Sequence, residues 1–314
     1  MPAAVDTVER WAGSGEPPVD GGPARTGPTG EVGESRLRQV AEVAGAHKSA
    51  TLGLLVVVAL VLFCWIGPLV YRTNQVATAL QLANRPPSVR FPLGTDNVGY
   101  SILGRLMAGG QTSLEVGLGA AAFALMLGVF WGSVSGYVGG LVDSVMMRIV
   151  DATLAIPIIF LLLFIASMVT PSVPLLIFII GLVSWPTPAR LIRAETLSLR
   201  HREYVDAART AGGGHTRVIF RHILPNALGT IIVNGTFQVS DAIIALASLS
   251  FLGLGIPPPA TNWGEMLSNG VNYVFEGYWW QVLPAGLAIV VIVVAFNLVG
   301  DGLRDVFEVR LRRR

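Results

Sequence analysis

Long apolar runs separated by polar stretches dominate this sequence. Six of them reach roughly the 20 mainly apolar residues that a helix needs to cross a bilayer. They lie at about 50–71, 112–138, 145–169, 174–194, 227–250 and 281–300. The pattern predicts an all-α, polytopic membrane protein with six transmembrane helices. Pro157, Pro186 and Pro188 each lack a backbone donor and are expected to kink or end the helices that contain them.

The polar stretches divide the chain into segments. Residues 1–48 are rich in Gly and Pro, so a disordered cytoplasmic tail is expected ahead of a first transmembrane helix at 49–72. Extracytoplasmic loops are predicted at 73–111 and 251–280. Residues 112–304 are predicted to form a core of five transmembrane helices, followed by a basic cytoplasmic C-terminus at 305–314.

The placement of arginine predicts the orientation. Six arginines between residues 191 and 221, and four among the last five residues, would lie in the cytoplasm with both termini, in agreement with the positive-inside rule. The 251–280 loop carries no Lys or Arg, whereas the 72–111 segment carries four arginines and supports this orientation less well.

Composition agrees with an integral membrane protein. The chain is 52% hydrophobic and only 13% charged, with a mean hydropathy of +0.61. A formal net charge of +2 is too small to indicate a nucleic-acid partner. Cys64, the single cysteine, lies within an apolar run and is expected to serve in packing.

Two local patterns concern helix packing. Glycines recur at every fourth position from Gly128 to Gly140, which on a helix forms a flat stripe. Such a stripe allows either tight packing of two helices or a seam that slides during transport. Near the start of the third run, Asp143, Arg148 and Asp151 predict an interfacial ion network, rather than a proton relay, in which Arg148 reaches Asp151.

Polar residues on the fifth run predict a face turned away from lipid. Asn234, Gln238 and Asp241 follow i, i+4, i+7 spacing and therefore lie on one side of a helix. An unpaired carboxylate in lipid costs several kcal/mol, so this face is expected to point into the bundle or a water-filled pathway. A substrate pathway and an interhelical hydrogen-bond cluster both remain open. Asn297 in the last run is a plausible partner in either case.

A polar segment between the fourth and fifth runs reads EYVDAARTAGGGHTRVIFRHILPN at 203–226. It predicts a short helix with acids in its first turn, a glycine reversal and a second helical segment. An apolar stripe of small residues follows i, i+3, i+4, i+7 spacing along the first helix at Tyr204, Ala207, Ala208 and Ala211. Docking in a groove of a soluble partner is favoured over an amphipathic helix on lipid, because alanine anchors poorly in a membrane.

Motifs spread over residues 91–306 carry a family resemblance. They read PLGTDNVG at 92–99, RIVDATLAIP at 148–157, WPTPARLIRAETLSLRHREYVDAAR at 185–209, RHILPNALG at 221–229, ASLSFLGLGIPPPATNWGEML at 247–267 and FNLVGDGLRD at 296–305. Together they resemble the C-type permease subunit of ATP-binding-cassette (ABC) importers for dipeptides and oligopeptides. Residues 206–208, with Gly212 and Leu224-Pro225, resemble the EAA loop of such permeases.

The resemblance departs from the family pattern at a few positions. Asp206 stands where the motif has Glu, and His222 stands where the general motif has Ile; neither puts coupling in doubt. Leu246 replaces an acid that many relatives carry. Asp241 replaces a small residue, so the substrate contacts of the fifth run are left open.

The resemblance implies a type I ABC importer permease fold in a bacterial inner membrane. The 203–225 loop would then be the coupling element seated on an ATPase, through Glu203, Tyr204, Asp206, Ala207, Ala208, Ala211, Gly212, Arg217, Arg221 and Pro225. The implied partners are a homologous second permease subunit, two ABC ATPase subunits, an extracytoplasmic substrate-binding protein and membrane lipid. Nickel complexes or other small solutes are alternative substrates. Outside the family, the alternative is a secondary transporter or channel working alone.

The 251–280 loop is expected to meet the loaded binding protein through Pro257, Pro258 and Trp263. A membrane-surface aromatic belt is the competing explanation for the tryptophans of this loop. The translocation pathway is expected along Asn234, Gln238, Asp241 and Asn297.

The sequence contains no catalytic or nucleotide-binding motif. A P-loop needs a glycine-rich turn and a lysine, yet the only lysine is Lys48, and His47 precedes it where glycine is required. HExxH, CxxC and GxSxG patterns are absent as well. We therefore expect a non-catalytic subunit that binds no cofactor and no metal, with ATP and Mg used by partner ATPases.

Overall fold

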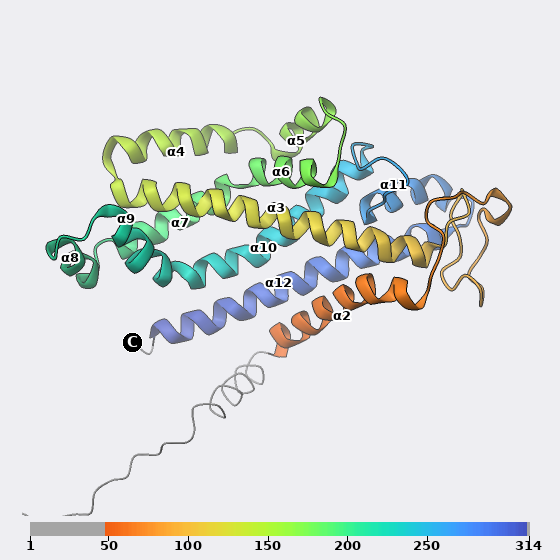
Figure 1. The fold of residues 1–314 in the computed structure, drawn as a ribbon, viewed down its shortest axis with the longest axis horizontal. Helices are drawn as coiled ribbons and strands as arrows, with labels where there is room; N and C mark the ends of the chain where they lie inside the picture. The colour runs from red at the N-terminus through yellow and green to blue at the C-terminus, as the bar shows by residue number, and fades with distance from the viewer. Residues whose placement is uncertain (1–47, 313–314) are drawn as a thin grey trace, which may run out of the picture. The chain divides into compact units, whose positions relative to one another are not determined.

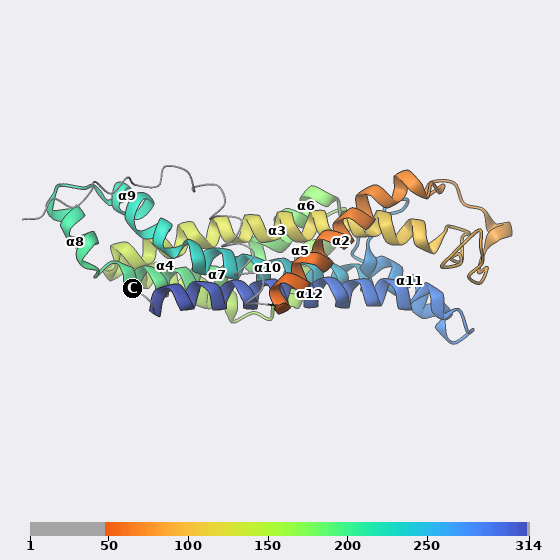
Figure 2. The ribbon, with the colours of Figure 1, turned by 90° about the horizontal axis from the view of Figure 1, so that it is seen from below.

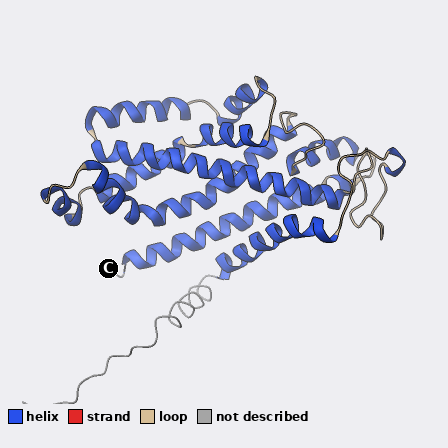
Figure 3. Ribbon diagram, in the orientation of Figure 1, coloured by secondary structure: helices blue, strands red, loops and turns tan. Residues whose placement is uncertain are grey.

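The computed structural model describes residues 48–312, with side chains to residue 307. All its named elements are helical (Figure 3), which confirms the all-α prediction. The helices are α2 (Lys48–Val70), α3 (Ile102–Val138), α4 (Gly140–Leu154), α5 (Ile158–Ser167), α6 (Val173–Ser184), α7 (Pro186–Leu199), α8 (Glu203–Thr210), α9 (His215–Val218), α10 (Leu224–Phe251), α11 (Trp263–Val274) and α12 (Leu283–Arg312). Short 3-10 turns lie at Leu80–Leu82 and Trp279–Gln281, and a π turn at Ile219–Ile223 joins α9 to α10. The predicted tail before Lys48 lies outside the described residues.

Four helical segments are long and apolar enough to cross a membrane: α2, α3, the run from α9 through α10, and the run from Trp279 through α12. Two further candidates are bent pairs. α4 and α5 meet at 80°, and α6 and α7 meet at 47°, so the described chain has up to six spans. Both bends lie at prolines that were predicted to kink or end helices, since Pro157 separates α4 from α5 and Pro186 begins α7.

One predicted loop boundary was wrong, and a second predicted loop contains a helix. α3 begins at Ile102 instead of 112, so the last ten residues of the predicted 73–111 loop are helical. The Ser101 hydroxyl accepts a hydrogen bond from the Gly104 N–H and caps the helix. The predicted 251–280 loop contains α11, which Asn262 caps through a hydrogen bond from the Glu265 N–H. Asn262 followed three residues later by Glu265 is a capping signature that could have revealed this helix.

The glycine stripe of α3 packs against α7. A Cβ atom added at Gly132 would lie 2.4 Å from the backbone oxygen of Ala189, and one at Gly136 would lie 2.9 Å from that of Arg193. Gly128 meets Pro188 and Ala189 in the same way. Gly140 does not belong to the stripe, because it has a φ of +59° and begins α4. Tight packing is therefore what the first three glycines provide.

The predicted pairing of Arg148 with Asp151 was wrong. α4 lies beside α7, and its acids meet the arginines of that helix instead. Asp143 accepts two hydrogen bonds from Arg193, at 2.5 and 2.6 Å, and Asp151 pairs with Arg190 at 2.6 Å. The Asp143 pair is the better shielded of the two. These contacts tie α4 to α7 at two points, which lie about two turns apart on α4.

The helices place two different structures at opposite ends of the bundle. α8, α9 and the C-terminal end of α12 lie at one end, and residues 71–101 lie with α11 at the other (Figures 1 and 2). α3 runs through the middle and packs against α2, α6, α7 and α10. Single continuous helices therefore connect the candidate sites at the two ends of the bundle.

Candidate functional site

The 203–225 segment forms the predicted helix, glycine turn and second helical segment. Gly212 adopts a φ of +79°, which favours glycine. The Gly213 N–H donates to the Ala208 carbonyl and closes the end of α8. α9 follows at once and continues through the π turn into α10.

Contacts that the sequence did not reveal anchor this element. Val205 of α8 is fully buried in a cluster with Val218, Ile219 and Ile223. The guanidinium of Arg209 lies 4.8 Å from the ring centre of Tyr137, at the end of α3, and its Nε donates to the Tyr137 hydroxyl at 3.3 Å. The only sequence feature that pointed to the burial of Val205 was its position off the small-residue stripe.

The predicted docking residues remain accessible. Tyr204 and Ala207 of α8 are exposed, as is Ala211 directly after the helix, whereas Ala208 is half-buried against the anchoring cluster. The other predicted contact residues are also exposed: Glu203, Asp206, Gly212, Arg217, Arg221 and Pro225. α8 therefore combines one buried anchor with a small-residue surface that nothing in the described chain covers.

The predicted pathway residues separate into two groups. Gln238 and Asp241 line a cavity of about 610 Å³ between α10 and the two bent helix pairs. Asn234 does not line it; its Oδ1 is buried and lacks a hydrogen-bond partner among the described residues. Asn297 is also outside the cavity lining and makes no side-chain hydrogen bond to the other three in the described chain. The predicted four-residue face is therefore not a single site.

Gln238 provides a hydrogen bond to the backbone at the bend between α6 and α7. In a continuous helix the carbonyl of Ser184 would accept from the N–H of residue 188, but Pro188 has none. The buried amide of Gln238 donates to this carbonyl at 3.4 Å. The predicted role as an interhelical hydrogen bond thus fits Gln238, whereas Asp241 makes no such bond within the described residues.

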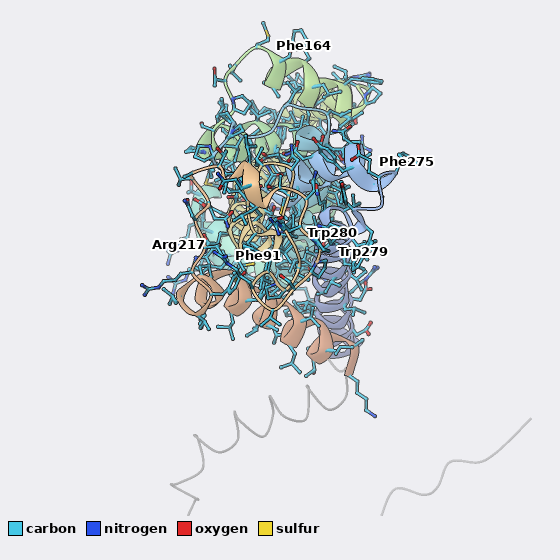
Figure 4. The ribbon with its side chains drawn as sticks, turned by 90° about the vertical axis from the view of Figure 1, so that its right-hand side faces the viewer. Phe91, Phe164, Arg217, Phe275, Trp279 and Trp280 are labelled. Carbon is cyan, nitrogen blue, oxygen red and sulfur yellow. The ribbon has the colours of Figure 1, made fainter. Side chains whose placement is uncertain are left out.

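The prediction that Trp263 faces a binding protein was wrong. Its side chain is 1% exposed, and its indole N–H donates to the Leu106 carbonyl of α3 at 2.9 Å. Gly110 leaves the space that the indole fills, because a Cβ there would lie 2.7 Å from the ring. Pro257 and Pro258 are exposed as predicted. Figure 4 shows this end of the molecule, where Phe275 and Trp279 are also exposed, in contrast to the buried Trp280.

We expect Trp263→Ala to lower the stability of the folded chain by about 3–5 kcal/mol, because it removes a large buried ring. The measurement is thermal unfolding of the purified complex in detergent. Pro257→Ala, on the exposed part of the same segment, serves as the control and should change little. A Trp263→Ala protein with unchanged stability but weakened binding to an external binding protein would contradict the structural role.

An ion pair joins α3 to the same end. Arg105 is buried, lies 3.6 Å from Glu265 and donates to the Pro259 carbonyl at 2.8 Å. Burial raises the pKa of Glu265 above its ordinary value, and the guanidinium of Arg105 counteracts this only in part. Burial raises the pKa of Asp96 in the neighbouring segment as well.

These directions predict a pH dependence. A carboxyl whose pKa is raised on folding binds its proton more tightly in the folded state, so its stabilising contribution is present below the unfolded pKa of about 4.3 and is lost as the pH rises through the folded pKa. The thermal midpoint should therefore fall as the pH rises above about 4.3. Glu265→Gln should reduce the change of the thermal midpoint with pH, and Asp96 should account for the change that remains. The same pH dependence in the wild type and in Glu265→Gln would show that Glu265 is not responsible for it.

Together these features define an all-helical, multi-pass membrane protein with an exposed helix–turn–helix at one end. Comparison with known families gives a match over residues 124–313 to the family described as binding-protein-dependent transport system inner membrane component. The chain belongs to this family, whose members are transport subunits.

Named relatives cover most of the chain. It is 37% identical over 268 residues to the oligopeptide transport system permease protein OppC of Bacillus subtilis, covering 85% of this chain and 88% of the relative. It is 36% identical over 267 residues to the dipeptide transport system permease protein DppC of the same species, covering 85% and 83%. A putative peptide transport system permease of Brucella abortus is 37% identical over 282 residues, covering 90% and 95%.

Proposed function

We propose that this protein is one of the two transmembrane subunits of an ATP-driven importer for dipeptides or oligopeptides. Its partners are a homologous second permease, two ABC ATPases that use ATP and Mg, and an extracytoplasmic substrate-binding protein. The chain itself is non-catalytic, and both of its termini face the cytoplasm. The observation that carries the proposal is the exposed small-residue face of α8, held in place by the buried Val205.

In this proposal α7 transmits the movement of the ATPases. Only residues 200–202 separate α7 from α8, and the other end of α7 reaches the cavity at Thr187. The pairs Arg193–Asp143 and Arg190–Asp151 attach α4 to α7. A shift of α8 would therefore move both bent pairs that border the cavity and change its accessibility from the two sides of the membrane.

Co-purification tests the assignment. A tagged chain, extracted from its native membrane in mild detergent, should bring down a second permease and an ATPase, and the reconstituted complex should take up peptides only with ATP and a binding protein. Uptake driven by an ion gradient, with no ATPase in the purified material, would contradict the proposal and favour a secondary transporter.

A further inference from the structure

The cavity beside α10 has mainly apolar walls. One side is a single face of α10, with Gln238, Asp241, Ala245 and Ser248. The opposite side is the break between α4 and α5, from Thr153 to Ile159, and the junction of α6 and α7 closes one edge. A volume of about 610 Å³ lies within the range of sites that hold small molecules.

Asp241 is the only charged residue among the described residues that line this cavity. The other polar side chains that line the cavity are uncharged: four serine or threonine hydroxyls and the amide of Gln238, which is engaged at the Ser184 carbonyl. Asp241 is accessible and forms neither an ion pair nor a hydrogen bond within the described chain. A carboxylate against apolar walls is costly unless a positive charge or hydrogen-bond donor approaches it.

The geometry points to a binding site for the cationic amino group of a solute, with Asp241 as its counter-ion and the apolar walls in contact with the rest of the solute. This inference rests on the proposed function, because it specifies which end of a peptide the permease recognises in transit. A free peptide amino terminus provides the required ammonium group, whereas an acylated one does not. The site would therefore discriminate by charge after the binding protein has released its cargo.

The test measures charge selectivity inside the cavity. Ser248 lies on the same face of α10, two turns beyond Asp241, so Ser248→Cys in a Cys64→Ala background places one thiol in the cavity. In the purified complex, its labelling rates with a cationic and an anionic methanethiosulfonate reagent are compared with and without Asp241→Asn. Asn272→Cys, exposed on α11, is the matched control thiol.

We expect the cationic-to-anionic rate ratio at Ser248→Cys to fall about tenfold with Asp241→Asn and to stay unchanged at Asn272→Cys. Leucyl-leucinamide should slow labelling at Ser248→Cys, whereas its neutral N-acetyl derivative should not, and Asp241→Asn should remove this difference. Equal protection by both probes, or a ratio that does not depend on Asp241, would overturn the inference while ATP-driven uptake persisted.

The alternative is an ion pair between Asp241 and a basic residue of the second permease. In that case the Asp241→Asn complex would lose the second permease during purification, and this result would also overturn the inference. Absence of an ATPase from the complex is a separate result, which would refute the proposed function.

Discussion

Ala207→Arg is expected to reduce ATP-driven uptake at least about tenfold, which corresponds to a loss of about 1.4 kcal/mol at a single contact. Ala207 is exposed on the small-residue face of α8, whereas Val205 of the same helix is buried. A long charged side chain would prevent close approach of a partner surface without disturbing the anchor. The measurement is uptake by the reconstituted complex, together with the amount of ATPase that co-purifies.

Thr210→Arg is the control for this substitution. It introduces the same charge on the same helix at an exposed position off the stripe. We expect the control to retain most of the uptake and most of the bound ATPase. Equal loss in both proteins would indicate a general effect of charge, and unchanged uptake in Ala207→Arg would remove α8 from the docking surface.

Gly132→Ala is expected to destabilise the folded chain by about 1–3 kcal/mol or more, because its Cβ would overlap backbone atoms that cannot move aside independently. The added atom would lie 2.4 Å from the Ala189 oxygen and 2.8 Å from the Arg193 nitrogen. Since α7 carries α8, separation of α3 from α7 should weaken ATPase binding as well. Thermal unfolding in detergent and ATPase co-purification measure the two effects.

Gly286→Ala on α12 is the matched control. Its added Cβ would meet only a terminal methyl of Leu267, at 3.3 Å, and alanine favours helix by about 1 kcal/mol over glycine. This variant should be neutral or slightly stabilised. If Gly132→Ala unfolded at the same temperature as wild type, the packing of α3 on α7 would not be as close as described.

Most of the helical pattern could be predicted from the sequence, because bilayer thickness sets the length of an apolar run and proline positions set where it breaks. The start of α3 could not. Its first turns contain Gly104, Gly109 and Gly110, whose role is visible only when Thr73, Asn262 and Cys64 pack against them. The ion pairs of α4 also depended on a neighbour that is remote in sequence, since Asp143 meets Arg193.

The candidate sites were predictable to different degrees. Helical spacing was sufficient to place the exposed stripe of α8, because periodicity is a local property. Trp263 was wrongly predicted to lie on the surface, because a tryptophan in a proline-rich segment is compatible with both exposure and burial. Its burial becomes evident only when Gly110 and the Leu106 carbonyl are known to face it. Spacing also grouped Asn234 with Asp241, although only the latter borders the cavity.

The central claim is that α8 contacts an ATPase, and site-specific cross-linking tests it most directly. Ala211→Cys in a Cys64→Ala background places a single thiol at the exposed end of the stripe. In the complete transporter, a short thiol-to-amine cross-linker should join this position to the ATPase subunit, and the yield should change when ATP is added. A transport-competent complex in which this thiol never cross-links to the ATPase would contradict the account.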